Sequence, residues 1–213
     1  NRETWRQVAR ATAAHSTVTV NAHSSCRFVA SKPYRQLLAG IPIVAGPRDV
    51  RTARDEQDGT ITLRASHDGY VTEYGLVHHR VMRLAADGRA LDGEDSFSDA
   101  EGNEPSGTAP DDYAVRFHLH PSIKASRLSD GRGVILLLPD KEVWTFATLA
   151  DAVQIEESVY LSASEGPRRT VQIVVYGNAR PAPVVRWSFR HTPPAQPGAR
   201  PDRIDEPELP LGK

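Results

Sequence analysis

Residues 66–80 carry the densest group of side chains in this sequence that are suited to chemistry. They include three of the chain's eight histidines and two of its six tyrosines. Imidazole can bind a metal ion and can gain or lose a proton near neutral pH. The segments on either side have alternating β-strand patterns, so we expect this stretch to form a turn where strands meet.

His15 and His67 are the strongest candidates because each is expected at the end of a strand, where side chains from separate strands converge. The segment between them supplies carboxylates at positions 49, 55, 56 and 58. A His-Asp-His set suits zinc. We therefore predict a zinc site that contains His15 and His67. The alternative, from spacing alone, is that both histidines are ordinary structural side chains.

The other polar side chains of residues 66–80 each allow two interpretations. Asp68 either orients an imidazole or caps a turn together with Gly69. Tyr74 either donates a hydrogen bond to a substrate or packs as an amphipathic ring. Arg80 either binds a substrate carboxylate or forms a cross-strand ion pair that adds little stability. His78 and His79 are adjacent, so at most one of them belongs to any single site.

A second histidine pair, His118 and His120, lies two residues apart in a strand pattern. Side chains at this spacing leave the same face of a sheet about 7 Å apart. The pair would hold a metal only if a neighbouring strand supplied a third ligand. The alternative is two imidazoles on the polar face of a sheet.

The elements that position these residues predict an all-β fold, an antiparallel β-sandwich or supersandwich of about 11–12 strands. Val115, Phe117 and Leu119 alternate with polar residues, and residues 133–138 are apolar on both faces, as in a central strand. Asp87-Gly88 predicts a tight hairpin. We expect a short helix near Trp5–Thr12, a long excursion over residues 31–57 with a buried piece at 41–44, a mobile loop over 92–110, and a disordered, proline-rich tail.

Composition excludes several classes of function. The 213 residues carry 26 basic and 27 acidic side chains with no long block of either sign, so nucleic acid is a poor partner. There is no run of about 18 apolar residues, hence no membrane-spanning helix is expected. No secretory signal is visible, and one cysteine, Cys26, cannot form an internal disulfide.

An ordered series of motifs resembles the C-terminal domain of the heparinase II/III family of polysaccharide lyases. Each motif is weak alone, but their order from about residue 5 to 190 is fairly specific. The motifs are Ala11–Val18, His67–Tyr70, Tyr74–Arg80, Leu91–Asp95, Arg116–Pro121, Trp144, Glu156–Tyr160 and Gln172–Val174.

This resemblance implies an enzyme in which an upstream α/α toroid, outside this sequence, precedes the β domain, with the substrate cleft between them. Residues 1–14 would be a linker or short helix, residues 15–190 the β-sandwich, and residues 191–213 the tail. Such enzymes cleave uronic-acid-containing polysaccharides by β-elimination: a base removes a proton beside a neutralised carboxylate while an acid protonates the leaving oxygen. We expect a periplasmic or otherwise exported protein.

The family's functional residues carry over only where the motifs match. His15 falls where the family has a histidine at the cleft, so it is the candidate catalytic residue. His67 falls where some relatives have a zinc ligand. Tyr74 and Arg80 are the candidate substrate-binding residues. Because the toroid's residues would complete the cleft, we expect this chain alone to be inactive.

Two other functions are compatible with the sequence. One is a non-catalytic carbohydrate-binding or structural β module, because no complete catalytic set is present. The other is a stand-alone, metal-dependent sandwich enzyme that uses His118 and His120. A metal bound at His15 would favour the lyase, whereas a metal bound at His118 would favour the stand-alone enzyme.

Overall fold

The computed structural model describes residues 5, 8–29, 43–150, 153–162 and 166–193, and these residues form antiparallel β-sheets with very little helix. The elements, in chain order, are η1 (Thr12–Ala14), β1 (Val18–Val20), β2 (Arg27–Phe28), β3 (Ile43–Ala45), β4 (Val50–Gln57), β5 (Thr60–Tyr70), α3 (Val71–Tyr74), β6 (Leu76–Leu84), β7 (Ala90–Ser98), β8 (Asp112–His118), β9 (Lys124–Arg127), β10 (Gly133–Leu137), β11 (Val143–Thr148), β12 (Val153–Ser162), β13 (Gly166–Asn178) and β14 (Val184–Thr192).

Two sheets form a sandwich, which confirms the predicted fold class. The small sheet has the order β1-β8-β13-β12, and the large sheet has the order β4-β5-β6-β7-β14-β11-β10-β9. Strands β2 and β3 form a separate pair. No helix in the described part of the chain combines the length and the apolar composition needed to cross a membrane. The expected tail lies outside the described residues from position 194 onward.

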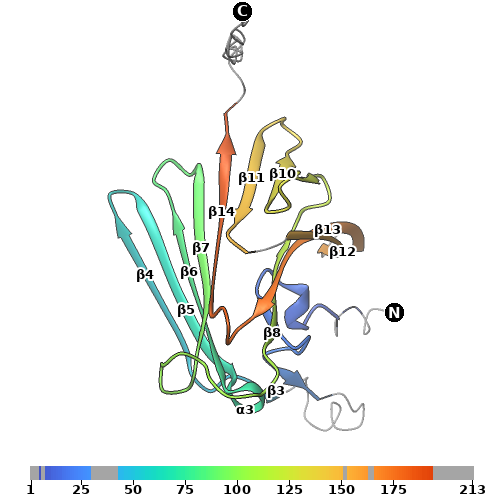
Figure 1. Cartoon of the computed structure of the whole chain (residues 1–213). Coiled ribbons are helices and arrows are strands. Elements are labelled where there is room, and N and C mark those ends of the chain that lie inside the picture. The colour runs from blue at the N-terminus through green and yellow to red at the C-terminus, as the bar shows by residue number, and fades with distance from the viewer. Residues whose placement is uncertain (1–4, 6–7, 30–42, 151–152, 163–165, 194–213) are drawn as a thin grey trace, which may run out of the picture.

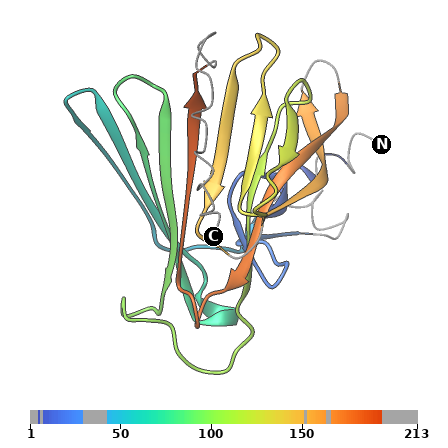
Figure 2. The same ribbon diagram turned by 45° about the horizontal axis from the view of Figure 1, so that its top comes forward.

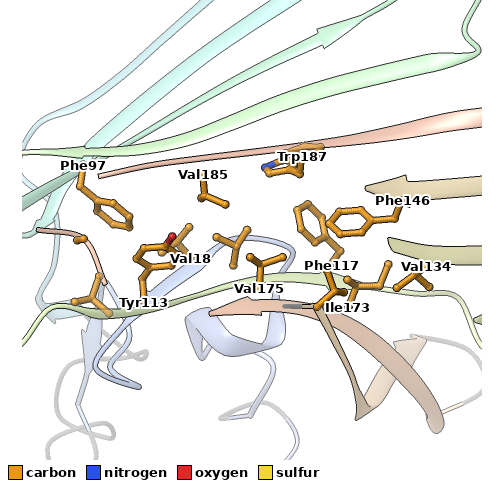
Figure 3. Packing of buried hydrophobic residues seen from close by; sticks show 14 of the residues in the cluster. Val18, Phe97, Tyr113, Phe117, Val134, Phe146, Ile173, Val175, Val185 and Trp187 are labelled. Carbon is orange, nitrogen blue, oxygen red and sulfur yellow. The ribbon is translucent and has the colours of Figure 1, made fainter. Parts of the chain in front are cut away.

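The core lies between the small sheet and the large sheet (Figure 3). It includes Tyr70 and Leu76, at the ends of β5 and β6 that adjoin α3. Strand β8 contributes Val115 and Phe117 from alternate positions, as its sequence pattern predicts. Phe146 and Trp187 meet them from the large sheet, and the Phe117 and Trp187 rings pack edge to face with centroids 4.7 Å apart. Burial of these large side chains is the main stabilisation of the sandwich.

One half of the large sheet is a wing formed by β4, β5 and β6, which extends beyond the small sheet (Figures 1 and 2). Every residue of β4 is exposed. The sequence prediction of a long excursion over residues 31–57 is therefore wrong for 50–57, and Ile43 and Val44, expected to be buried, are 58% and 63% exposed. β4 has no apolar face, so periodicity could not reveal it.

A hairpin turn explains why β4 forms. Asp58 and Gly59 have φ angles of 50° and 75°, as in the tight turns that favour Asp-Gly. They bring β4 into register with β5 from the Val50–His67 pair to the Gln57–Thr60 pair. The hairpin predicted at Asp87-Gly88 is confirmed between β6 and β7, where Gly88 has a φ of 70°.

Three further expectations are corrected by the structure. Residues 92–98, expected in a mobile loop, belong to β7, because its acidic residues find basic partners on neighbouring strands. β10 is apolar on both faces but buried on one only, since Ile135 and Leu137 are each 39% exposed. His191, the first residue of the expected tail, belongs to β14 and pairs with Trp144 on β11, and the two rings pack edge to face.

Candidate functional site

The structure divides the predicted site residues between two clusters. His67 and Arg80 belong to a buried network around Asp95, in the large sheet. His15 lies instead in an open groove beside His118 and His120. The network around Asp95 is closed to ligands because it is buried, whereas the groove at His15 is open to solvent.

Asp95 is the centre of the buried network and is fully inaccessible to solvent. Its Oδ1 accepts hydrogen bonds from His78 Nε2 at 2.8 Å and Arg80 Nε at 2.7 Å. Its Oδ2 accepts from Arg80 Nη2 at 2.9 Å and Trp187 Nε1 at 2.8 Å. Burial alone would raise the pKa of Asp95, but the His78 hydrogen bond and the Arg80 charge outweigh it and lower that pKa.

The histidines of this network have fixed proton positions. The Gly69 amide donates to His67 Nδ1 at 3.2 Å, so a neutral His67 carries its proton on Nε2. His67 Nε2 lies 3.3 Å from His78 Nδ1, which must accept, and His78 Nε2 then donates to Asp95. Burial, with a further contribution from His78, lowers the pKa of His67 to about 4. Every polar atom of this chain of contacts is occupied within the protein.

The remaining predicted residues of the 66–80 stretch also have internal partners. Arg80 forms a bidentate, buried pair with Asp95, stronger than the surface pair its sequence context indicated. The Tyr74 side chain is 7% exposed, and its hydroxyl hydrogen-bonds His23 Nδ1. Asp68 accepts the Arg48 and Asp49 amides, so it fixes the start of β4 rather than capping a turn. Substrate binding by Tyr74 and Arg80 stays a prediction.

The turn in this stretch comes later than predicted. β5 continues through His67 to Tyr70, and the chain then turns through α3. Gly75, in a left-handed conformation with a φ of 67°, ends that helix. Because β5 continues, His67 faces into the network and not toward an open strand end.

The histidine groove is a hollow of about 520 Å³ on the small sheet that is open to solvent. Three histidines and one tyrosine supply most of its chemistry. Its lining residues are Ala9, Ala14, His15, His118, Leu119, His120, Val159, Tyr160, Leu161 and Thr170. They come from the segment before β1, from the end of β8 and from paired strands β12 and β13.

His15 is exposed, and one of its nitrogens is already committed. Its Nε2 lies 3.0 Å from the Ala9 carbonyl, which can only accept, so Nε2 carries a proton. The neutral ring therefore presents Nδ1 as an acceptor. A histidine held in this tautomer is suited to receive a proton from a bound molecule.

His120 presents the complementary tautomer. The Ser122 amide donates to His120 Nδ1 at 3.3 Å, so the neutral ring carries its proton on Nε2. Its ring packs edge to face with Tyr160, with centroids 4.9 Å apart. His120 thus offers a donor beside Tyr160, which also lines the groove.

His118 is the most constrained histidine of the groove. Its Nε2 donates to the Ala13 carbonyl at 3.0 Å, and its Nδ1 lies 2.7 Å from Ser158 Oγ. Burial lowers its pKa. Since both nitrogens are engaged, His118 holds residues 13–16 against the small sheet and does not present a free atom to a ligand.

Tyr160 was not predicted as a site residue, and His15 was not predicted to lie beside the His118–His120 pair. Tyr160 lies on β12, opposite Arg168 on β13, and β13 in turn pairs with β8. The alternating pattern of residues 154–161 indicated which face of the strand Tyr160 occupies. Its neighbours, however, depend on strand order, which no local pattern encodes.

The predicted zinc site is not assembled by the described residues. His15 lies in the groove and His67 in the buried network. The described residues include no group of three or more His, Cys, Asp or Glu side chains that could hold a metal ion. Zinc binding through His15 and His67 stays a prediction.

Comparison with known proteins identifies a family and a relative in sequence. The family model described as "Heparinase II/III-like, C-terminal" matches residues 1–188. FtsZ-localized protein C from Caulobacter vibrioides is 33% identical over 181 residues, which is 83% of this chain and 31% of that protein. The chain thus spans less than a third of the length of this relative.

Solved structures share the fold at low identity. Heparan sulfate lyase HepC from Pedobacter heparinus has a TM-score of 0.64 and 14% identity, covering 89% of this chain and 26% of that enzyme. A heparinase III gene product has a TM-score of 0.62 and 11% identity, with 90% and 26% coverage. At these identities the similarity establishes the fold, and this chain corresponds to about a quarter of each enzyme.

Proposed function

The chain belongs to the heparinase II/III-like, C-terminal family, and on that premise we propose that it forms one wall of the substrate cleft of a polysaccharide lyase. Its histidine groove would bind an acidic, uronate-containing polysaccharide. Cleavage by β-elimination would be a property of the whole protein, completed by residues outside this chain. A periplasmic or exported location stays a prediction.

The observation that carries this proposal is the pair of complementary histidines in one open groove. His120 offers an N–H donor suited to a carboxylate, and His15 offers an acceptor suited to a hydroxyl group or an acidic proton. Exposed Arg168 and Arg169 lie opposite Tyr160 and Val159 on β13, and because successive residues of a strand point to opposite faces, one of the two arginines shares the face of Tyr160.

These groups match the needs of β-elimination only in part. The reaction requires a base, an acid and a group that neutralises the uronate carboxylate. In this proposal His15 serves as the base, and His120 holds the carboxylate. Tyr160 would stack against a sugar ring with its apolar face.

A binding assay tests the groove directly. We expect the chain to bind heparin or alginate but not neutral dextran. The double variant His15→Ala with His120→Ala should weaken binding to the acidic polymer about tenfold or more, a change of about 1.4 kcal/mol in the binding free energy. His79→Ala is the matched control, because His79 is half-buried on β6 and hydrogen-bonds Ser98 instead. Equal binding to dextran, or an equal loss in the control, would contradict the proposal.

A second assay tests the lyase activity. The full-length parent protein should release unsaturated uronate products, detected by their ultraviolet absorbance, from at least one uronate polymer. His15→Ala should lower kcat and leave the far-ultraviolet circular dichroism spectrum unchanged. Retained polysaccharide binding without any unsaturated product would support the groove but reject the lyase.

A non-catalytic role is the second candidate, and the relative at 33% identity favours it. That relative is named for localization with FtsZ, whereas the lyases with this fold are only 11–14% identical to this chain. We propose that this chain, if it has no lyase partner domain, is a module whose location follows FtsZ. A fluorescent fusion that co-localizes with FtsZ, and disperses when FtsZ is depleted, would favour this role over the lyase.

A further inference from the structure

β4 is an eight-residue strand at one edge of the large sheet. Among the residues that the structure describes, β4 pairs only with β5, and it is exposed along its whole length. It contains no proline, and its register with β5 is continuous from residue 50 to residue 57. An edge strand of this kind can pair with a strand from another chain.

The other edges of the two sheets differ from β4. β9, at the opposite edge of the large sheet, has four residues, and β1, at one edge of the small sheet, has three. β12 is long but lies against β9, and its charged residues, Glu156 and Glu157, are both acidic. Short or single-sign edges resist pairing with a copy of themselves.

The backbone of β4 has the hydrogen-bonding groups that such pairing needs. The Asp68 amide donates to the Asp49 carbonyl at 3.2 Å, so the backbone groups of Asp49 face β5. Because successive residues of an antiparallel pair direct their amide and carbonyl groups to opposite sides, those of Val50, Thr52, Arg54 and Glu56 turn away from β5. These four residues can bond a further strand.

The charges of β4 are self-complementary. Basic Arg51 and Arg54 precede acidic Asp55 and Glu56 along the strand. Two antiparallel copies of β4 would be related by a two-fold axis perpendicular to the sheet, which keeps each side chain on its own face. Residues that lie opposite each other must therefore share a face, so one residue lies at the axis, opposite its own copy. Centred on Ala53, the pair sets Arg51 of each copy opposite Asp55 of the other. Centring on Arg54 or Asp55 would place like charges face to face.

We propose that two copies of this chain pair through β4, antiparallel and centred on Ala53, to join their large sheets into one continuous sheet. Thr52 of each copy then lies opposite Arg54 of the other, with both residues presenting outward backbone groups. The small methyl group of Ala53 lies at the axis. This interface lies on the wing and is independent of the histidine groove.

Sedimentation equilibrium with charge-swapped variants tests this proposal. We expect the wild-type chain to be a dimer. Arg51→Asp should raise the dissociation constant about tenfold or more, because it sets two carboxylates opposite each other at both ends of the interface. Combining it with Asp55→Arg should restore the wild-type value, since the opposite charges are exchanged. Lys124→Asp on β9, at the opposite edge of the large sheet, is the control and should leave the dimer intact.

A backbone variant tests the strand pairing itself. Thr52→Pro removes an amide that points away from β5, so we expect it to dissociate the dimer and to keep the melting temperature of the monomer. A wild-type chain that stays monomeric overturns the proposal. So does a dimer that tolerates Arg51→Asp, or one that the double exchange fails to restore, because either result excludes pairing centred on Ala53.

Discussion

The two halves of the large sheet are built from the same kind of hydrogen-bonded strands but are stabilised differently. β14, β11 and β10 cover the small sheet and bury Trp187, Phe146 and Val134. The wing of β4, β5 and β6 leaves every residue of β4 exposed and holds its register through hairpins. A strand can thus form without a buried face when turns and a neighbouring strand determine its position.

Between these halves lies the Asp95 network, which joins them. Asp95 on β7 accepts from His78 and Arg80 on the wing and from Trp187 on the covered half. It thereby links the wing to the core with charge-assisted hydrogen bonds, which are stronger than neutral ones. We therefore expect large effects of mutation in the covered half and at Asp95, and small effects on the outer wing.

The largest expected effect is in the covered half. Phe146→Ala removes a ring that is completely buried against Phe117 and Phe189, and should lower the free energy of unfolding by about 3–5 kcal/mol. Leu63→Ala on the wing, where the side chain is 39% exposed, should change it by less than about 0.5 kcal/mol. Urea denaturation measures both, and similar losses would show that the wing is packed in solution.

The next effect tests the connection between the halves. Asp95→Asn replaces an oxygen that accepts two hydrogen bonds with an amide that must donate, leaving Arg80 buried without its full partner. We expect a loss of about 3–5 kcal/mol. Asp92→Asn, in the exposed pair with Arg190, should cost at most about 1 kcal/mol. If both variants unfold at the same urea concentration, the network does not join the halves.

The smallest of these effects depends on pH and concerns His67. Its pKa is about 4 in the folded chain and 6.5 when unperturbed. Above pH 6.5 neither the folded nor the unfolded chain binds this proton, so His67 does not lower the free energy of unfolding. Between pH 6.5 and 4 only the unfolded chain takes it up, and the free energy of unfolding should fall by on the order of 3 kcal/mol at most.

Matched variants identify the source of this pH dependence. His67→Gln should make the decline between pH 6.5 and 4 shallower, measured as the urea midpoint at each pH. His120→Gln, at an exposed position of the groove, should retain the wild-type slope. An unchanged slope in His67→Gln would assign the decline to other groups.

The parts of the fold that were predicted correctly are those that local chemistry encodes. Alternation identified β8, and Asp87-Gly88 identified the β6–β7 hairpin. β4 was missed although Asp58-Gly59 is the same signal, because the strand before it has no apolar face. Residues 92–98 of β7 were predicted to be a loop because acidic residues favour solvent. In the structure Asp95 pairs with Arg80 and Asp92 with Arg190, which stabilises the strand.

The candidate site depended more strongly on the tertiary structure. The sequence alone identified His15, His67, His118 and His120 as residues able to bind ligands or protons, because that ability belongs to imidazole. Strand order decided that His67 joins a closed network, while His15 and His120 share an open groove with Tyr160. Local pattern determines which face a side chain takes, and only the packing of distant strands determines what it faces.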